Sequence, residues 1–291
     1  MVALMFAGQG SQQKGMGDGL FSKYAELTRK ADDILGYSIE ELCMEDPGGK
    51  LVQTQFTQPA LYVVNALHYL EKKESGMKPD YVLGHSIGEF NSLHAAGVVD
   101  FETGLRLVKL RGELMGQAKG GGMAAVMGLA QDEVAKLLKE NGFDNLYIAN
   151  CNSPFQYVIS GLKEDIVRAE EVFIANDVPN FKVLNVSGAF HTPFMEEARK
   201  EFEQFVDTFK YGEILIPIIS NVTARPYVQE NIKEYIVKQI TSPVMWTESI
   251  RYLLAVGVCE FDEAGSQQVV KKLAKRIVKE AGPLDLSGEM L

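Results

Sequence analysis

The sequence predicts an α/β protein in which a small lobe is inserted into a larger domain. A short apolar strand turns through a sharp corner into a helix at 81–97, which is typical of a sheet with helices packed on it. The segment 122–187 alternates strands and helices as a unit of its own, with glycines at both ends. The predicted boundaries are therefore 1–121 and 188–291 for the larger domain and 122–187 for the lobe. A chain of 291 residues, 46% of them hydrophobic, is long enough for both.

The N-terminal part begins with an apolar strand at 2–7, which is followed by a polar loop. Two glycines flank Gln9 in this loop and let the backbone approach a ligand closely, although a simple strand-to-helix turn explains the same residues. A helical pattern covers 20–35. The segment 54–59 predicts a turn, with Pro59 in the first turn of the helix that follows.

The corner at 84–88 has the pattern G-x-S-x-G, with Ser86 at its centre. Between a strand and a helix this pattern is typical of a nucleophile elbow, in which a strained turn presents a serine hydroxyl at the mouth of a sheet. The flanking glycines have to be small because strand and helix pack closely there. The N–H of Ile87 points toward the place where an oxyanion would form. An ordinary tight turn is the alternative interpretation.

The helix predicted at 101–118 places one charged side chain within its apolar stripe. Apolar residues stand one turn before and one turn after Arg111. A buried guanidinium needs an anion, because it cannot lose its proton. This anion is either an internal Asp or Glu or the carboxylate of a substrate held by two parallel hydrogen bonds, and the pattern does not decide between them.

The inserted lobe follows the order β-α-β-β-α-β, which is that of a ferredoxin-like unit. Its strands are predicted at 123–129, 146–150, 156–160 and 181–186, and its helices at 132–141 and 163–176. Asn152 and Gln156 line the loop between the two middle strands, where such residues most often cap turns.

After the lobe the chain returns to the larger domain through a loop that contains His191. This is a suitable position for a base that acts on Ser86. His68 and His94 lie within predicted helices and His85 points away from the corner, so these three are weaker candidates. The remaining elements are strands at 214–219 and 258–261 and helices at 246–254 and 268–279, with little order expected beyond residue 281.

Charge and cysteine usage exclude several classes of function. The formal net charge is −10 and the pI about 5.0, whereas nucleic-acid binding requires a basic face. The three cysteines lie far apart without a C-x-x-C motif, which is unfavourable to a metal site and typical of a reducing compartment. No membrane span and no basic leader are recognisable, so a cytoplasmic protein is expected. Basic residues cluster on the last helix, where they form either a solvated face or a phosphate site: Lys271, Lys272, Lys275 and Arg276.

A series of short motifs runs through nearly the whole chain in a fixed order. They are Gly8-Gln-Gly-Ser-Gln, Gln58-Pro-Ala-Leu, Gly84-His-Ser-Ile-Gly-Glu, Arg111-Gly, Gly122-Met-Ala-Ala-Val, Asn152-Ser-Pro, Ile159-Ser-Gly, Ala189-Phe-His, Ser220-Asn-Val-Thr-Ala and Pro243-Val-Met-Trp. With them the chain resembles the malonyl-CoA:acyl carrier protein transacylases from about Leu4 to Ile277. The stretch that begins at Thr54 and the form Gly188-Ala-Phe-His resemble free-standing acyltransferases that serve polyketide assembly lines in trans.

The resemblance implies an α/β-hydrolase-like large domain with the ferredoxin-like lobe inserted. It implies Ser86 as the nucleophile and His191 as its base, with the backbone carbonyl of Gln239 accepting from the imidazole in place of the acid of a triad. Gln9 and the backbone N–H of Ile87 would hold the oxyanion.

The resemblance also implies how the substrate would bind. Arg111 would pair with the malonyl carboxylate with support from Gln58, and the ring of Phe190 would leave little room for an α-methyl group. Three further residues are expected to belong to the substrate site near the serine: Asn152, Gln156 and His85.

Malonyl-CoA and an acyl carrier protein are the expected partners, and the reaction requires no cofactor and no metal ion. An editing acyl hydrolase is the alternative function, although such relatives typically lack the carboxylate-binding arginine. One departure from the family is the segment 263–268, which replaces a Gly-Pro-Gly-type turn at the rim of the entrance. An acidic carrier would need a local basic patch, for which the last helix is a candidate.

Overall fold

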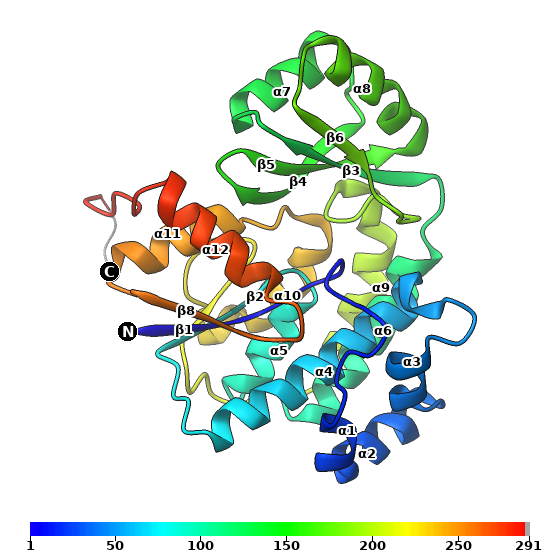
Figure 1. Cartoon of the computed structure of the whole chain (residues 1–291), viewed down its shortest axis with the longest axis vertical. Coiled ribbons are helices and arrows are strands. Elements are labelled where there is room, and N and C mark those ends of the chain that lie inside the picture. Colours follow the sequence, from blue (N-terminus) through cyan, green and yellow to red (C-terminus); the bar gives the residue numbers. More distant parts are fainter. Residues whose placement is uncertain (289–291) are drawn as a thin grey trace.

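A parallel four-stranded sheet forms the centre of the larger part of the molecule (Figure 1). The structure is a computed structural model, and it describes residues 1–288. The strand order is β7-β2-β1-β8, with β1 at Val2–Phe6, β2 at Tyr81–Gly84, β7 at Ile218–Ile219 and β8 at Glu260–Ala264. Phe6 pairs with Gly84 and with Ala264, so the carboxyl ends of three strands meet at one edge.

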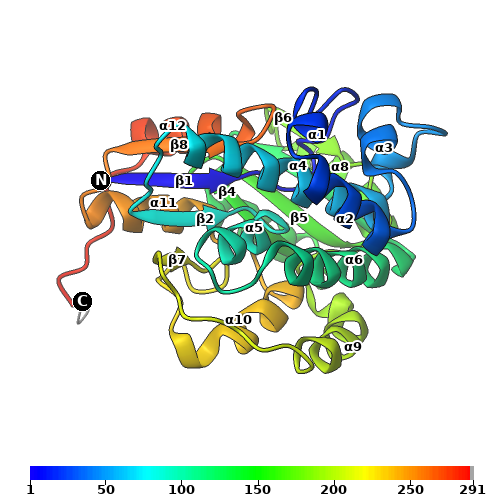
Figure 2. The same cartoon turned by 90° about the horizontal axis from the view of Figure 1, so that it is seen from below.

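Helices cover both faces of this sheet, because the side chains of each strand alternate between two apolar layers. Leu4 and Phe6 belong to one layer, while Ala3 and Met5 belong to the other. The helices on the first side are α1 (Leu20–Lys23), α2 (Ala25–Leu35), α3 (Ile39–Glu45), α4 (Thr54–Glu74), α5 (Gly88–Ala95), α6 (Phe101–Gln117), α9 (Glu196–Val206) and α10 (Ile232–Lys238). The second side carries α11 (Trp246–Ala255) and α12 (Val269–Glu280), as Figure 2 shows in a view from below. Short 3₁₀ turns complete the larger part: η1 (Lys50–Val52), η2 (Pro193–Met195), η3 (Gln229–Asn231) and η4 (Gln239–Thr241).

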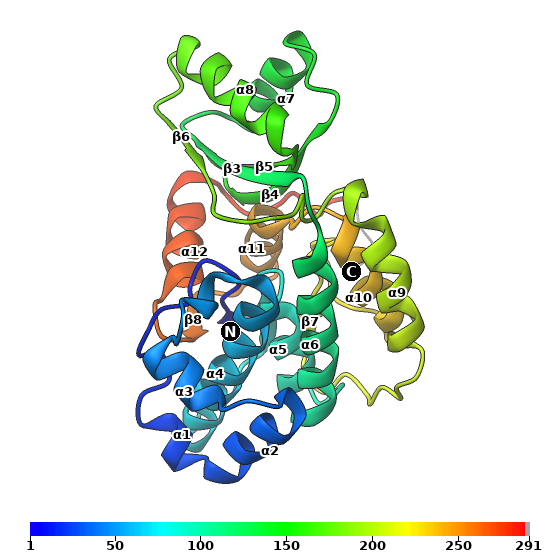
Figure 3. The same cartoon turned by 90° about the vertical axis from the view of Figure 1, so that its right-hand side faces the viewer.

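The second sheet is antiparallel and separate from the first. It has the order β4-β5-β3-β6, formed by β3 (Gly121–Met127), β4 (Leu146–Ser153), β5 (Gln156–Leu162) and β6 (Asn180–Val183). With α7 (Gln131–Glu140) and α8 (Lys163–Ala175), it confirms the predicted element order β-α-β-β-α-β. Figure 3 shows this lobe at one end of the molecule, entered directly from α6.

The two faces of the antiparallel sheet have different neighbours. Ala124 and Val126 point into an apolar cluster with α7 and α8. Met123 and Ala125, one residue out of step on the same strand, join the core of the larger part. A cavity between the lobe and the parallel sheet is therefore lined by strands of the lobe on one side.

Several sequence-based expectations about elements need correction. The strand expected at 181–186 ends at Val183, and Asn152 and Gln156, which were expected in a loop, lie in β4 and β5. The helix expected at 20–35 is interrupted at Tyr24, which leaves helical geometry with φ −113° and ψ 46°. The turn expected at 54–59 is wrong, because α4 already begins at Thr54 and Pro59 lies inside it. Burial of most of this helix outweighs the backbone hydrogen bond that the proline lacks.

The strand expected at 214–219 is also too long, because only Ile218 and Ile219 pair with β2. The strand expected at 258–261 begins two residues later, at Glu260. Beyond residue 281 the described residues form no helix or strand, as expected, yet the N–H of Leu284 donates to the carbonyl of Arg251 (3.1 Å). The same expectation for residues 289–291 lies outside the described part of the chain.

Candidate active site

Three glycines allow the backbone to pack closely at the corner after β2. A Cβ on Gly84 would lie 1.9 Å from the carbonyl carbon of Gly88, and one on Gly88 would lie 2.3 Å from the carbonyl oxygen of Phe6. A Cβ on Gly8 would lie 2.4 Å from the carbonyl oxygen of His85. The corner, the first strand and α5 are therefore in backbone contact, as the sequence predicts.

Ser86 sits at the tip of this corner in a strained conformation with φ 51°. Asn221, in the loop after β7, stabilises this strained backbone conformation by two hydrogen bonds. Its Oδ1 accepts from the Ser86 N–H (2.7 Å), and its Nδ2 donates to the Gly84 carbonyl (2.7 Å). Sequence reasoning assigned Asn221 no role, because an asparagine in a loop carries no signal of its tertiary partners.

His191 lies within hydrogen-bonding distance of the serine. Its Nε2 is 2.7 Å from Ser86 Oγ, and its Nδ1 is 2.9 Å from the carbonyl of Gln239. Since a carbonyl only accepts, the Nδ1 carries the proton and Nε2 is free to accept from the hydroxyl. Burial, and then the charge of Arg111, lower the pKa of His191 to about 3, so the ring is neutral at rest.

The guanidinium of Arg111 is fully buried beside the same serine. Its Nη1 donates to Gln58 Oε1 (2.7 Å), and its Nη2 donates to Gln239 Oε1 (2.8 Å) and to Ser86 Oγ (3.2 Å). Burial lowers the pKa of Arg111 to about 10, which leaves it charged at neutral pH.

The partners of this guanidinium are neutral, and it forms no ion pair with a described carboxylate. Its Nε is buried without a hydrogen-bond partner. The internal salt bridge that the pattern of the helix left open is therefore absent from the described residues. A fixed positive charge with unused donors lies next to the candidate nucleophile.

Glu89 is a buried acid close to this arrangement that sequence reasoning missed. Its Oε1 accepts from the N–H of Asn221 (2.9 Å) and from the hydroxyl of Tyr227 (3.0 Å), and its Oε2 accepts from Nε2 of Gln239. Burial raises the pKa of Glu89 to about 7, against the effect of these hydrogen bonds. The carboxylate contacts the side chain of Gln239, and it is the backbone carbonyl of Gln239 that contacts His191.

A cavity of about 250 Å³, here called the inner chamber, contains the serine, the histidine and the arginine. Ten of the eleven predicted site residues line it: Gln9, Gln58, His85, Ser86, Ile87, Arg111, Asn152, Gln156, Phe190 and His191. Gln239, the eleventh, lies behind the chamber and supplies its carbonyl and amide from there.

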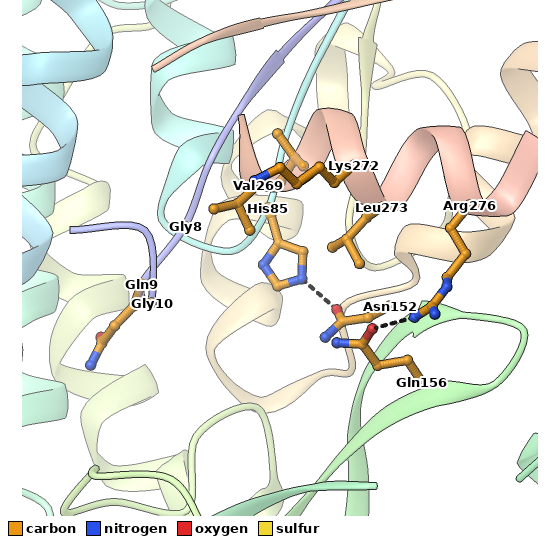
Figure 4. A pocket seen from close by; sticks show the side chains of 11 residues that line it. Gly8, Gln9, Gly10, His85, Asn152, Gln156, Val269, Lys272, Leu273 and Arg276 are labelled. Atoms are coloured by element: carbon orange, nitrogen blue, oxygen red, sulfur yellow. Dashed lines mark hydrogen bonds between the residues drawn. The ribbon is translucent and has the colours of Figure 1, made fainter. Parts of the chain in front are cut away.

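A second cavity of about 390 Å³, the vestibule, shares residues with the inner chamber and continues it along α12 (Figure 4). His85 and Asn152 stand at the junction, with His85 Nε2 2.7 Å from Asn152 Oδ1. Arg276 donates to Gln156 Oε1 (3.3 Å). Lys272 and Arg276 line the vestibule. Within the same predicted cluster Arg276 pairs with Glu280 (3.2 Å) and Lys271 pairs with Asp262 (2.7 Å).

Two kinds of site are absent from residues 1–288. No group of three or more His, Cys, Asp and Glu side chains is placed to hold a metal ion. No helix in the part of the chain that the structure describes is long and apolar enough to cross a membrane.

Comparison with known proteins agrees with this geometry. Residues 4–283 match the model of the acyl transferase domain. The polyketide biosynthesis malonyl CoA-acyl carrier protein transacylase BaeC of Bacillus velezensis is 54% identical over 282 residues, which are 96% of this chain and 98% of that protein. The polyketide biosynthesis protein PksE of Bacillus subtilis is 53% identical over 98% of this chain, but this chain spans only 37% of it.

Solved structures lead to the same family. The malonyl CoA-acyl carrier protein transacylase of Burkholderia pseudomallei superposes with a TM-score of 0.93 at 48% identity, over 97% of this chain and 99% of that one. A type II polyketide synthase acyl carrier protein in complex with its malonyl-transacylase contains a chain that matches with a TM-score of 0.90 at 33% identity, over 97% of this chain and 94% of that one. From its sequence and its mixed α/β fold, this chain belongs to the acyl transferase domain family.

Proposed function

We propose that this protein transfers a malonyl group from malonyl-CoA to the phosphopantetheine thiol of an acyl carrier protein, supplying a polyketide (or fatty acid) synthase in trans. The observation that carries the proposal is the buried charge of Arg111, which has neutral partners and lies 3.2 Å from Ser86 Oγ. A chamber with a nucleophile, a base and an unpaired buried cation fits an acyl group that ends in a carboxylate. The names of the relatives support the same substrate and partner.

The first half-reaction loads the serine. Ser86 Oγ attacks the thioester carbonyl while its proton passes to Nε2 of His191, which lies 2.7 Å away. The carbon–sulfur bond then breaks, and the imidazolium returns the proton to the sulfur of CoA. In this proposal Gln9 and the N–H of Ile87, two residues that line the chamber, stabilise the oxyanion between these steps.

The bound acid also affects the base. The charge of Arg111 is the second cause of the low pKa of His191. A malonyl carboxylate on Arg111 neutralises that charge, so it raises the pKa of His191 and makes the imidazole a better proton acceptor. The carboxylate takes the unused Nη1–H and the Nη2–H that now faces Ser86 Oγ.

In the second half-reaction the carrier thiol gives its proton to His191, and its sulfur forms a bond to the ester carbonyl. The bond between that carbonyl and Ser86 Oγ breaks, and the proton returns to the serine. The pantetheine arm reaches the chamber through the vestibule along α12 in this proposal, and Asn152, Gln156 and His85, which line both cavities, supply polar contacts. Phe190, which is buried at the chamber wall, limits the space beside the acyl α-carbon.

We further propose that the larger part is α/β-hydrolase-like and the lobe ferredoxin-like, with boundaries at 1–121, 122–187 and 188–291. The parallel sheet with the elbow after β2 supports the first assignment. The element order of the lobe supports the second. The reaction uses no cofactor and no metal ion, and a cytoplasmic location stays a prediction, which the buried free cysteines Cys43 and Cys151 support.

Intact-mass measurement of the protein mixed with malonyl-CoA tests the function. The expected result is a malonyl adduct on Ser86 that disappears when a holo acyl carrier protein is added, with malonyl appearing on the carrier. Absence of the adduct would overturn the proposal. Fast release of free acid without transfer, from malonyl- and acetyl-carrier alike, would replace it with the editing acyl hydrolase.

A further inference from the structure

We propose that Glu89 is a positioning residue that fixes the orientation of the Gln239 amide and so keeps the donors of Arg111 free for an incoming carboxylate. The proposal rests on the proposed function and adds a determinant of substrate choice to it. Glu89 is buried in α5, on the far side of Gln239 from the guanidinium. It contacts neither Arg111 nor His191 by a hydrogen bond in the described structure.

The hydrogen bonds of the side-chain amide fix the orientation of Gln239. Its Nε2 uses both hydrogens, one to Oε2 of Glu89 and one to the carbonyl of Ser86 (2.9 Å). Its Oε1 is thereby turned toward Arg111, from which it accepts at 2.8 Å. The same residue gives its backbone carbonyl to the imidazole of His191 (2.9 Å). Gln239 therefore contacts the cation through its side chain and the base through its backbone.

The groups around Glu89 require a carboxylate at this position. Every polar neighbour donates to it: the N–H of Asn221, the hydroxyl of Tyr227 and the amide of Gln239. A carboxylate offers acceptors on both oxygens, whereas a glutamine offers one acceptor and one N–H₂ group. In Glu89→Gln an N–H₂ group replaces one of the two carboxylate oxygens. It then faces either the N–H₂ of Gln239 or the N–H of Asn221 and the hydroxyl of Tyr227, so a donor faces a donor in either placement.

The spacing between the two charges has a consequence for the substrate. A direct ion pair between Glu89 and Arg111 would neutralise the guanidinium and occupy the N–H groups that a substrate carboxylate needs. With the amide of Gln239 between them, the negative charge still stabilises the buried guanidinium, since Glu89 raises the pKa of Arg111 against the effect of burial. The cation beside Ser86 thus keeps an Nε and one Nη1–H that have no acceptor among residues 1–288.

The test compares how fast malonyl-CoA and acetyl-CoA acylate Ser86, followed by intact mass in the full-length protein. Glu89→Gln is expected to lower the malonyl-to-acetyl ratio about 10- to 100-fold, because a flipped Gln239 amide displaces Arg111 while acetyl does not use that cation. Glu263→Gln is the matched control. Glu263 is a second buried glutamate, which accepts from the N–H groups of Val269 (3.2 Å) and Lys271 (2.9 Å) at the vestibule end of α12 and does not line the inner chamber. This variant is expected to lose stability but to keep the ratio.

A charge-conserving swap, Glu89→Gln with Gln239→Glu, separates positioning from stability. It keeps one carboxylate and one amide but brings the carboxylate directly onto Arg111. It is expected to lose far more malonyl loading than acetyl loading. An unchanged ratio in Glu89→Gln, or in the swap, would overturn the proposal. If the unaltered protein forms no malonyl adduct, the proposed function itself fails instead. Thermal unfolding of each variant shows whether it is folded when the ratio is measured.

Discussion

Replacing Arg111 with alanine tests how the substrate acid is recognised. The change removes a fully buried guanidinium and leaves Ser86 and His191 in place. It also leaves Gln58 Oε1 and Gln239 Oε1 without the donor that each now has. Loss of the contacts with Gln58, Gln239 and Ser86 affects every acyl group, whereas loss of the donors for a substrate carboxylate affects only an acyl group that has one.

The size of the selective effect follows from the two hydrogen bonds to that carboxylate. A hydrogen bond to a charged group contributes about 1.5–3 kcal/mol, so two of them contribute roughly 3–6 kcal/mol. The kcat/KM for malonyl-CoA is therefore expected to fall about 10²- to 10⁴-fold more than that for acetyl-CoA. The preference of Arg111→Lys for malonyl-CoA over acetyl-CoA should lie between those of the unaltered protein and of Arg111→Ala. An ammonium keeps the charge but cannot bond both glutamines and a carboxylate in one plane.

The assay is the transfer of each acyl group to a holo carrier protein, with kcat/KM measured for malonyl-CoA and acetyl-CoA in parallel. Relatively better acetyl transfer by Arg111→Ala is the expected outcome. Equal losses for both acyl groups would refute the role of Arg111 in binding the acid and would make it a structural cation.

Four further predictions follow from the same geometry. Ser86→Ala should form no acyl adduct by intact mass, and a persistent adduct would place the nucleophile elsewhere. Gly84→Ala should lose at least about 3 kcal/mol of unfolding free energy in urea, because its Cβ meets backbone at 1.9 Å, while Gly282→Ala, with nothing within 4 Å, should lose little. Phe190→Ala should raise methylmalonyl relative to malonyl loading by about tenfold or more, and no change would remove the ring as the limit on size. The pKa of His191 falls from 6.5 to about 3 on folding, so between these pH values the unfolded chain binds a proton on His191 that the folded chain does not. The free energy of unfolding should therefore decrease as the pH drops from 6.5 toward 3, and it should decrease less steeply in His191→Asn.

The sequence predicted that Ser86 and His191 lie close together, because the corner at 84–88 and the loop with His191 carry local signals. The strand, the glycines and the serine are neighbours in the chain, so their pattern survives without knowledge of the fold. The buried position of Arg111 was visible for the same reason, since helical spacing places it in an apolar stripe.

What supports these groups could not be read from the chain. Asn221 is 135 residues from Ser86, and Glu89 is 150 residues from Gln239, so no local pattern connects them. Glu89 even stands within the motif that carries the resemblance, but an acid in the first turn of a helix is usually an exposed residue that favours the helix dipole. Pro59 misled in the other direction, because the usual place of a proline is the first turn of a helix, whereas α4 begins five residues earlier, at Thr54.

A structure of the protein with malonyl on Ser86 would test the central claim most directly. The claim predicts that the malonyl carboxylate lies within hydrogen-bonding distance of the guanidinium of Arg111, with Gln58 and Gln239 still holding that guanidinium from behind. A carboxylate that points instead into the vestibule, toward Lys272 or Arg276, would contradict it.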